Sequence, residues 1–266
     1  MSTQEPPSLH QATIDAITSY AGRATLGFQR ANRPGPYGTL FWFNELLEST
    51  EEADTVRPLL LTAVEQTRYE VAELAPRPEM CDPGPSAERS LITQFAQGWT
   101  ELAGLGVAVQ STAFLDAYAA DRGWSWKTDE ITDGVAARTE DIDRITAEPV
   151  TAYALGHDVA RRTGAREQAV VVGALARMQD GTIRWSTELP TGCVGAPVFY
   201  SAPDDDEEGP DSFKLVCAGV LLPADNKGFG HHPVATFDRI REALSALPVL
   251  EPSPSTRGRR WWHRRK

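Results

Sequence analysis

Two clusters of short, β-rich runs constrain the fold of this chain more than any other sequence feature. The first cluster lies between residues 24 and 112, and the second lies between residues 148 and 223. The runs do not alternate with long helical patterns, which argues against a parallel α/β sheet. The sequence therefore predicts an all-β fold built as paired barrels or as a sandwich.

Helices are expected only at the two ends of this β-rich region and between the clusters. Leu9–Tyr20 has the apolar spacing of a short amphipathic helix, with Ser8 placed as its N-terminal cap. Residues 114–145 are expected to be helical or irregular. The closing segment, residues 234–247, repeats apolar residues at the spacing of an amphipathic helix.

Composition and charge narrow the class of protein. The 266 residues are 41% hydrophobic and 24% charged, which suits a globular protein with one large all-β unit or two domains. The net charge is −11, and because Arg257–Lys266 contributes six positive charges and no negative one, the remainder carries −17. An acidic body of this kind argues against nucleic acid as the ligand of the folded part.

Cysteine use and hydropathy favour a cytoplasmic protein. Cys81, Cys193 and Cys217 are an odd, widely spaced set, which suits free thiols in a reducing compartment. No run reaches the roughly 18–20 apolar residues that cross a bilayer. The opening residues, MSTQEPPSLHQ, lack the basic and apolar segments of a secretion signal.

The most distinctive motif is PTGCVGAPVFY, Pro190–Tyr200. Its glycines and proline are spaced as in the Gly-Asp-Ser-Gly-Gly-Pro-Val loop that surrounds the nucleophile of trypsin-like, chymotrypsin-fold serine peptidases. The motif resembles that loop, but the position of the serine is occupied by Val194.

Two further segments resemble the same family, in the chain order His, Asp, Ser of its catalytic triad. PLLLTAVEQ, residues 58–66, resembles the strand that precedes the catalytic histidine, and the histidine position falls on Glu65. GLGVAVQ, residues 104–110, resembles the strand opened by the aspartate, and that position falls on Gly106. The strand GTLFWFN, residues 38–44, also has a counterpart in the family.

The resemblance covers roughly residues 24 to 247 and implies a fold of two six-stranded-type β-barrels with short N- and C-terminal helices. A trypsin-like double-barrel domain is then expected over residues 23–250. In chain order the expected parts are an N-terminal helix and extension (1–22), barrel one (about 23–115), barrel two (about 145–235), a closing helix (234–247) and a basic, tryptophan-containing tail (251–266).

The three replaced positions remove the chemistry that the family uses. Its mechanism needs an oxygen nucleophile, a base within hydrogen-bond reach and an acid that orients the base. Val194 offers two methyl groups, Glu65 has no serine to deprotonate, and Gly106 has no side chain. We therefore expect a catalytically inactive pseudoprotease that acts as an intracellular binding or regulatory module. A peptide or protein segment in the cleft between the barrels is the expected partner.

Part of the cleft does not depend on side chains. The oxyanion hole of the family is made of backbone N–H groups, which the resemblance assigns to Gly192 and Val194. An active peptidase or hydrolase using Cys193 is the alternative function. The resemblance argues against it, because Cys193 stands one residue before the nucleophile position, where the side chain points into the protein. A buried structural thiol is the simpler interpretation.

A second alternative is a surface-association protein that works through its tail. Arg257–Lys266, RGRRWWHRRK, combines charge with two tryptophans and suits anionic lipid or nucleic acid. The same segment suits a solvated tail, or one that folds back onto an acidic surface such as Asp204–Glu208. The sequence shows no metal-ligand spacing and no phosphate-binding loop, so we expect neither a metal nor a cofactor.

Overall fold

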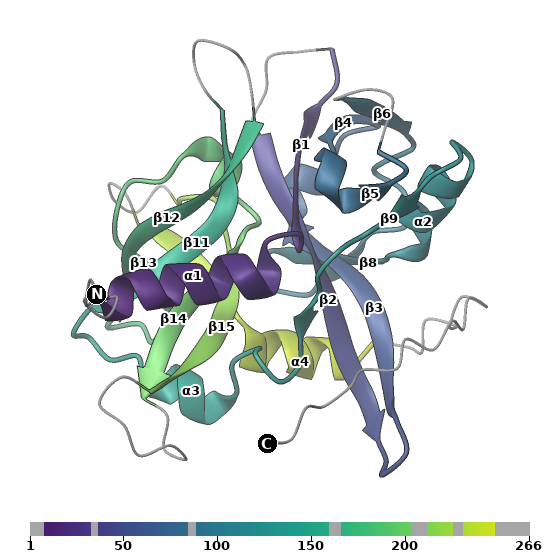
Figure 1. Cartoon of the computed structure of the whole chain (residues 1–266). Coiled ribbons are helices and arrows are strands. Elements are labelled where there is room, and N and C mark those ends of the chain that lie inside the picture. The colour runs from purple at the N-terminus through teal and green to yellow at the C-terminus, as the bar shows by residue number, and fades with distance from the viewer. Residues whose placement is uncertain are drawn as a thin grey trace, which may run out of the picture.

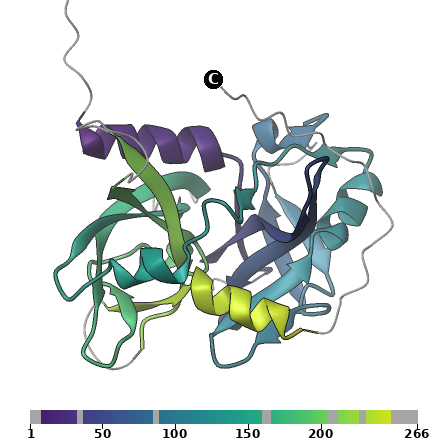
Figure 2. The same cartoon turned by 90° about the horizontal axis from the view of Figure 1, so that it is seen from below.

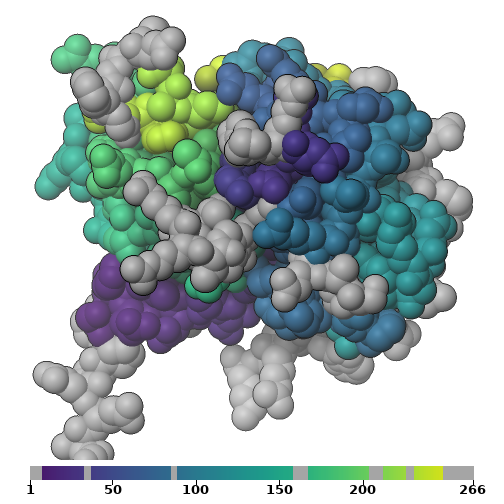
Figure 3. Space-filling view, turned by 90° about the horizontal axis from the view of Figure 1, so that it is seen from above, coloured from purple at the N-terminus to yellow at the C-terminus, as the bar shows by residue number. Residues whose placement is uncertain are grey.

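The computed structural model of the protein describes residues 8–32, 37–84, 89–159, 166–203, 212–225 and 231–247. Most of these residues lie in two β units, one after the other along the chain (Figure 1). The space-filling view shows the two units packed directly against each other (Figure 3). The predicted all-β, two-barrel fold is confirmed, with one difference in the first unit.

The first unit is an eight-stranded sheet in the order β6-β4-β1-β2-β3-β8-β7, with β10 added in parallel to β2. Within the described residues, β6 and β7 do not pair, so the hydrogen-bonded path stays open where a closed barrel was expected. These edge strands have only four and three residues, which leaves little backbone for closure. The strands are β1 (Thr25–Arg30), β2 (Tyr37–Ser49), β3 (Asp54–Ala63), β4 (Val71–Ala75), β6 (Ser90–Thr93), β7 (Thr100–Leu102), β8 (Val107–Ser111) and β10 (Ile131–Thr132).

The second unit is a closed barrel in the order β11-β12-β13-β16-β15-β14. Its longest antiparallel pair joins β11 to β12, with Val150 opposite Leu175 at one end and Val159 opposite Arg166 at the other. The strands are β11 (Val150–Val159), β12 (Arg166–Arg177), β13 (Ile183–Trp185), β14 (Pro197–Pro203), β15 (Phe213–Leu221) and β16 (His232–Thr236).

Short elements join and cover the two units. The predicted first helix is confirmed: Ser8 Oγ accepts a hydrogen bond from the Gln11 amide at the start of α1. The remaining elements are helices α1 (Leu9–Ala21), α2 (Ala113–Ala120), α3 (Thr139–Asp143) and α4 (Phe237–Ser245), 3-10 turns η1 (Val64–Thr67), η2 (Pro78–Met80) and η3 (Thr191–Cys193), and the paired strands β5 (Cys81–Asp82) and β9 (Ser125–Trp126).

Helix α4 ties the two units together. It begins at Phe237, three residues later than the sequence pattern predicted, because Val234 to Thr236 pair with β15. The Phe237 ring packs against Phe43 of β2, with centroids 4.9 Å apart. Figure 2 shows α4 lying beneath both units. One continuous apolar core therefore runs from the second barrel onto one face of β2 and β3. A second core lies within the first unit and includes Leu40, Trp42 and Leu60, which alternate along β2 and β3 with residues of the first core.

Candidate functional site

The glycine-rich turn of the second barrel packs directly on β2 and β3 of the first sheet. Thr39 donates from Oγ1 to the Gly192 carbonyl (2.6 Å) and from its amide to the Val194 carbonyl (2.8 Å). Gly195 has φ +86°, and a Cβ atom there would overlap the Thr39 carbonyl and the Thr62 hydroxyl. Only glycine fits this backbone at this approach. We call the four residues Thr39, Thr62, Gly192 and Gly195 the barrel seam.

The segments that carry the three positions singled out by the family resemblance contact one another beside the barrel seam. Glu65 lies on η1, and the residue before it donates its amide to the Gly106 carbonyl (2.9 Å). The Ala63 amide nitrogen would lie 3.1 Å from a Cβ atom at Gly195, the residue after Val194. The Glu65 side chain is exposed and Val194 is half-buried. The structure thus brings together the three segments that carry Glu65, Gly106 and Val194.

The backbone donors of the turn are partly engaged within it. The Val194 amide donates to the Thr191 carbonyl (3.3 Å), and the Cys193 amide donates to Pro190 (3.0 Å). Gly192 is buried so tightly that a Cβ atom would overlap the His157 carbonyl oxygen. A ligand carbonyl that used the Val194 amide would have to displace the contact with Thr191.

Cys193 faces the interior of the second barrel. It is fully buried, and its Sγ would lie 2.6 Å from a Cβ atom at Gly156 of β11. The next residue, His157, faces the other side of the strand, where its Nε2 lies 3.2 Å from Thr25 Oγ1. The nearest histidine along β11 therefore points toward β1 and away from the Cys193 thiol.

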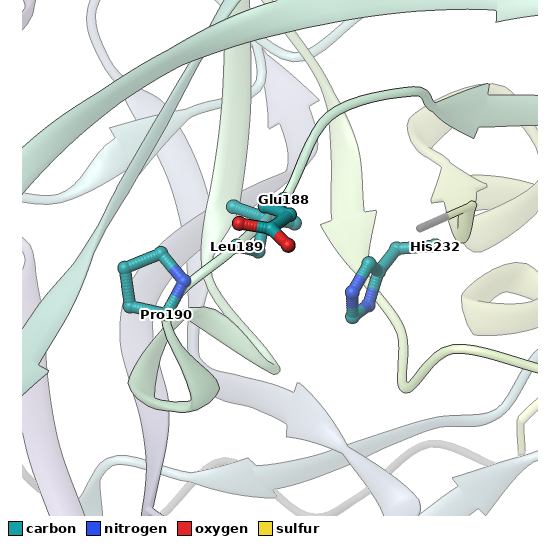
Figure 4. Close-up of a pocket in the computed structure, with 4 residues that line it drawn as sticks. All are labelled: Glu188, Leu189, Pro190 and His232. Carbon is teal, nitrogen blue, oxygen red and sulfur yellow. The ribbon is translucent and has the colours of Figure 1, made fainter. Parts of the chain in front are cut away.

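A pocket of about 560 Å³ opens next to the turn, lined by Glu188, Leu189, Pro190 and His232. Figure 4 shows the Glu188 carboxylate and the His232 ring facing each other across it. His232 donates from Nδ1 to the Leu222 carbonyl (2.9 Å), which orients the ring and, in the neutral imidazole, leaves Nε2 as an acceptor. Sequence reasoning missed both polar residues, because the pairing of β13 with β16 brings them together.

The remaining features considered in the sequence are metal sites, membrane spans and two charged segments. In the ranges that the structure covers, no three His, Cys, Asp or Glu side chains gather in a way that would hold a metal ion. No helix in the described part of the chain has the length and apolar character to span a bilayer. The basic segment Arg257–Lys266 and the acidic run Asp204–Glu208 lie outside the described residues.

Comparisons with known proteins bear on the fold. No family model and no curated protein matches the sequence. Among solved structures, Deg5 matches with a TM-score of 0.50 and 11% identity over 90% of this chain and 95% of that chain. The serine endoprotease from Yersinia pestis matches with a TM-score of 0.47 and 11% identity, over 91% of this chain and 67% of its own.

An inactive form of Rv3671c from M. tuberculosis matches with a TM-score of 0.46 and 10% identity, over 95% of this chain and 99% of its own. Identities this low speak for the fold alone. The architecture predicted from the three motifs is confirmed, and the chain has the two-barrel fold of the trypsin-like serine endoproteases.

Proposed function

We propose that this chain is a catalytically inactive relative of the trypsin-like peptidases that binds other proteins. The observation that supports the proposal is that the segments carrying Glu65, Gly106 and Val194 contact one another beside the barrel seam, through Val64 on Gly106 and Ala63 on Gly195. Hydrolysis by the family route needs an oxygen nucleophile next to a base. Val194 supplies no such nucleophile, so Glu65 has no hydroxyl to deprotonate. The odd, widely spaced set of cysteines supports a cytoplasmic setting, and the regulatory role is part of the same proposal.

The proposed ligand is an extended peptide segment with a basic side chain. The Glu188 carboxylate favours a lysine or arginine head group, because charge-assisted hydrogen bonds are the stronger ones. Leu189 and Pro190 supply apolar surface for the methylene stem of such a side chain. His232 adds an acceptor nitrogen whose orientation is fixed by Leu222.

A peptidase assay tests the inactive state. The full chain should give no turnover of unfolded protein substrates and no labelling by a fluorophosphonate probe. Turnover that disappears in Cys193→Ala, but survives in the matched variant of another buried thiol, Cys217→Ala, would replace this proposal with the Cys193 hydrolase.

A binding assay tests the ligand. Peptides with one lysine should bind the full chain more tightly than the same peptides with glutamine, and Glu188→Gln should remove most of that difference, roughly a tenfold change. Glu101→Gln, an exposed acid on β7, is the matched control and should leave binding unchanged. Equal binding of both peptide series by the unmodified chain would contradict the proposed ligand.

A further inference from the structure

The hairpin of β2 and β3 extends well past the rest of the first sheet (Figure 1). β10 pairs with β2 only as far as Asn44, and β8 pairs with β3 only from Leu59 onward. We call residues 45–57 the hairpin arm. In the part of the chain that the structure describes, the two outer edges of the hairpin arm pair with no other strand.

The surface of the hairpin arm is both apolar and acidic. Leu46, Leu47 and Val56 are 37%, 56% and 40% exposed, and Leu46 lies opposite Val56 across the hairpin. At the base of the arm Arg57 is already paired with Glu45, so the tip keeps a net negative charge. The exposed acids of the tip are Glu48, Glu51, Glu52 and Asp54.

The last described helix ends beside this arm. Arg57 of β3 donates from Nη2 to the Leu244 carbonyl in the final turn of α4 (3.5 Å). The described chain stops three residues later, at Leu247. The sequence that follows contains Arg257–Lys266, with six basic residues and two adjacent tryptophans. A basic, aromatic segment thus begins ten residues after Leu247, which ends the described chain near the base of an acidic, apolar arm.

Chain length permits contact between the two. Trp261 lies fourteen residues beyond Leu247, which gives a reach of up to about 46 Å. The hairpin arm rises about 23 Å from Arg57 to its turn, at about 3.3 Å per strand residue. A tether of this length gives an effective concentration on the order of millimolar, so that individually weak contacts suffice.

We infer that Arg257–Lys266 binds the hairpin arm of its own chain. In this arrangement Trp261 and Trp262 cover the exposed leucines and valine, because indole rings bury large apolar area. The arginines face the acids of the tip, where opposite charges attract and salt weakens the contact. A segment held in this way is withdrawn from anionic lipid and nucleic acid.

Carbodiimide coupling of the full chain tests the contact directly, because it joins a lysine to a carboxylate without a spacer. Lys266 is the one lysine after Lys227. At low salt, Lys266 should couple to acids within residues 48–54, and a mixture of isotopically light and heavy chains should yield no mixed products. Coupling mainly to residues 204–208, coupling between chains, or no coupling of Lys266 would each overturn the inference.

A matched pair of variants separates docking from chance collision. Leu47→Ser keeps every carboxylate of the hairpin arm but removes apolar surface, and it should lower the coupling yield several-fold. Leu91→Ser changes a leucine of similar exposure, 51%, on the edge strand β6 and should leave the yield unchanged. Equal yields in both variants would contradict the apolar contact.

Vesicle binding gives a second readout. Replacing Glu48, Glu51, Glu52 and Asp54 by their amides should free the basic segment and tighten binding to phosphatidylserine vesicles roughly tenfold, given the small contribution of each exposed ion pair. Unchanged vesicle binding would show that the hairpin arm does not hold the segment. None of these measurements depends on the peptide pocket, so either proposal can fail alone.

Discussion

The barrel seam and the neighbouring pocket share the stretch of chain from Glu188 to Gly195, yet they are built in opposite ways. Thr39, Thr62, Gly192 and Gly195 are buried, and the contacts at the two glycines leave no room for even one extra carbon atom. The pocket residues Glu188, Leu189, Pro190 and His232 are exposed or half-buried, with space between them. The comparison teaches that the glycines of the motif serve the joint between the two units, so their presence alone says nothing about catalysis.

The largest expected effect comes from adding a methyl group to the barrel seam. Gly192→Ala would place Cβ against the His157 carbonyl of β11, a backbone atom that cannot move without disturbing the barrel. We expect the free energy of unfolding to fall by about 3 kcal/mol, as is typical of severe overpacking. Urea-induced unfolding of the full chain measures it.

Gly134→Ala is the matched control for that variant. A Cβ atom at Gly134 would meet only the Thr132 hydroxyl at 3.8 Å, an ordinary contact. Its free energy of unfolding should stay within about 0.5 kcal/mol of the unmodified chain. If both alanines cost the same, the close approach of Gly192 to the His157 carbonyl does not limit packing at the barrel seam.

A smaller effect is expected from removing one hydrogen bond of the barrel seam. Thr39→Val deletes the Oγ1 donor and leaves the buried Gly192 carbonyl without this partner. We expect a loss of about 2 kcal/mol in the free energy of unfolding, the usual cost of a buried unsatisfied group. Thr55→Val, in the exposed part of β3, should change stability little. Equal losses in the two variants would show that this hydrogen bond contributes nothing to the joint.

The glycines of the barrel seam could be identified from the sequence, because the backbone conformation and close packing there require glycine. Gly195 must adopt a positive φ and Gly192 must admit a carbonyl, and both requirements appear as glycines at fixed spacing from Pro197. The runs around Leu60 and Val107 likewise show the apolar texture of buried strands. Motif order therefore predicted the fold, in which the segments carrying the three replaced positions lie next to one another.

The pocket and the open edge of the first sheet could not be predicted, because no local sequence motif specifies either one. Glu188 and His232 come from distant segments, and they face each other only because Trp185 of β13 pairs with His232 of β16. Nothing in either local sequence specifies that register. The open path between β6 and β7 was missed for a similar reason. It depends on the short lengths of these two strands, four and three residues, and a sequence pattern does not fix strand ends that closely.

Thiol and phenol groups buried away from the pocket should make the protein less stable at alkaline pH. Burial, with a smaller contribution from Glu79, raises the pKa of the Cys81 thiol to about 11, while an unfolded thiol titrates near pH 8.5 to 9. The unfolded state then loses its proton first, so the free energy of unfolding falls as the pH rises from about 9 to about 11. Burial raises the pKa of Tyr200 and of Cys217 in the same direction.

Urea unfolding at pH 8, 9.5 and 11 measures this loss, which we expect to be about 1 kcal/mol for Cys81 after allowing for solvent screening. Cys81→Ala should flatten the decline, because it removes one of the titrating groups. A decline as steep in Cys81→Ala as in the unmodified chain would assign the alkaline limit to other residues.

The smallest expected change in the free energy of unfolding comes from a substitution in the pocket, Glu188→Gln. The Glu188 side chain is exposed, so Glu188→Gln removes a charge without opening a cavity or orphaning a buried group. Its free energy of unfolding should change by less than about 0.5 kcal/mol, the usual range for surface substitutions. Urea unfolding beside Thr39→Val, in the same buffer, provides the comparison. If Glu188→Gln were as destabilising as Thr39→Val, the pocket would be part of the joint between the units and could not vary independently as a ligand site.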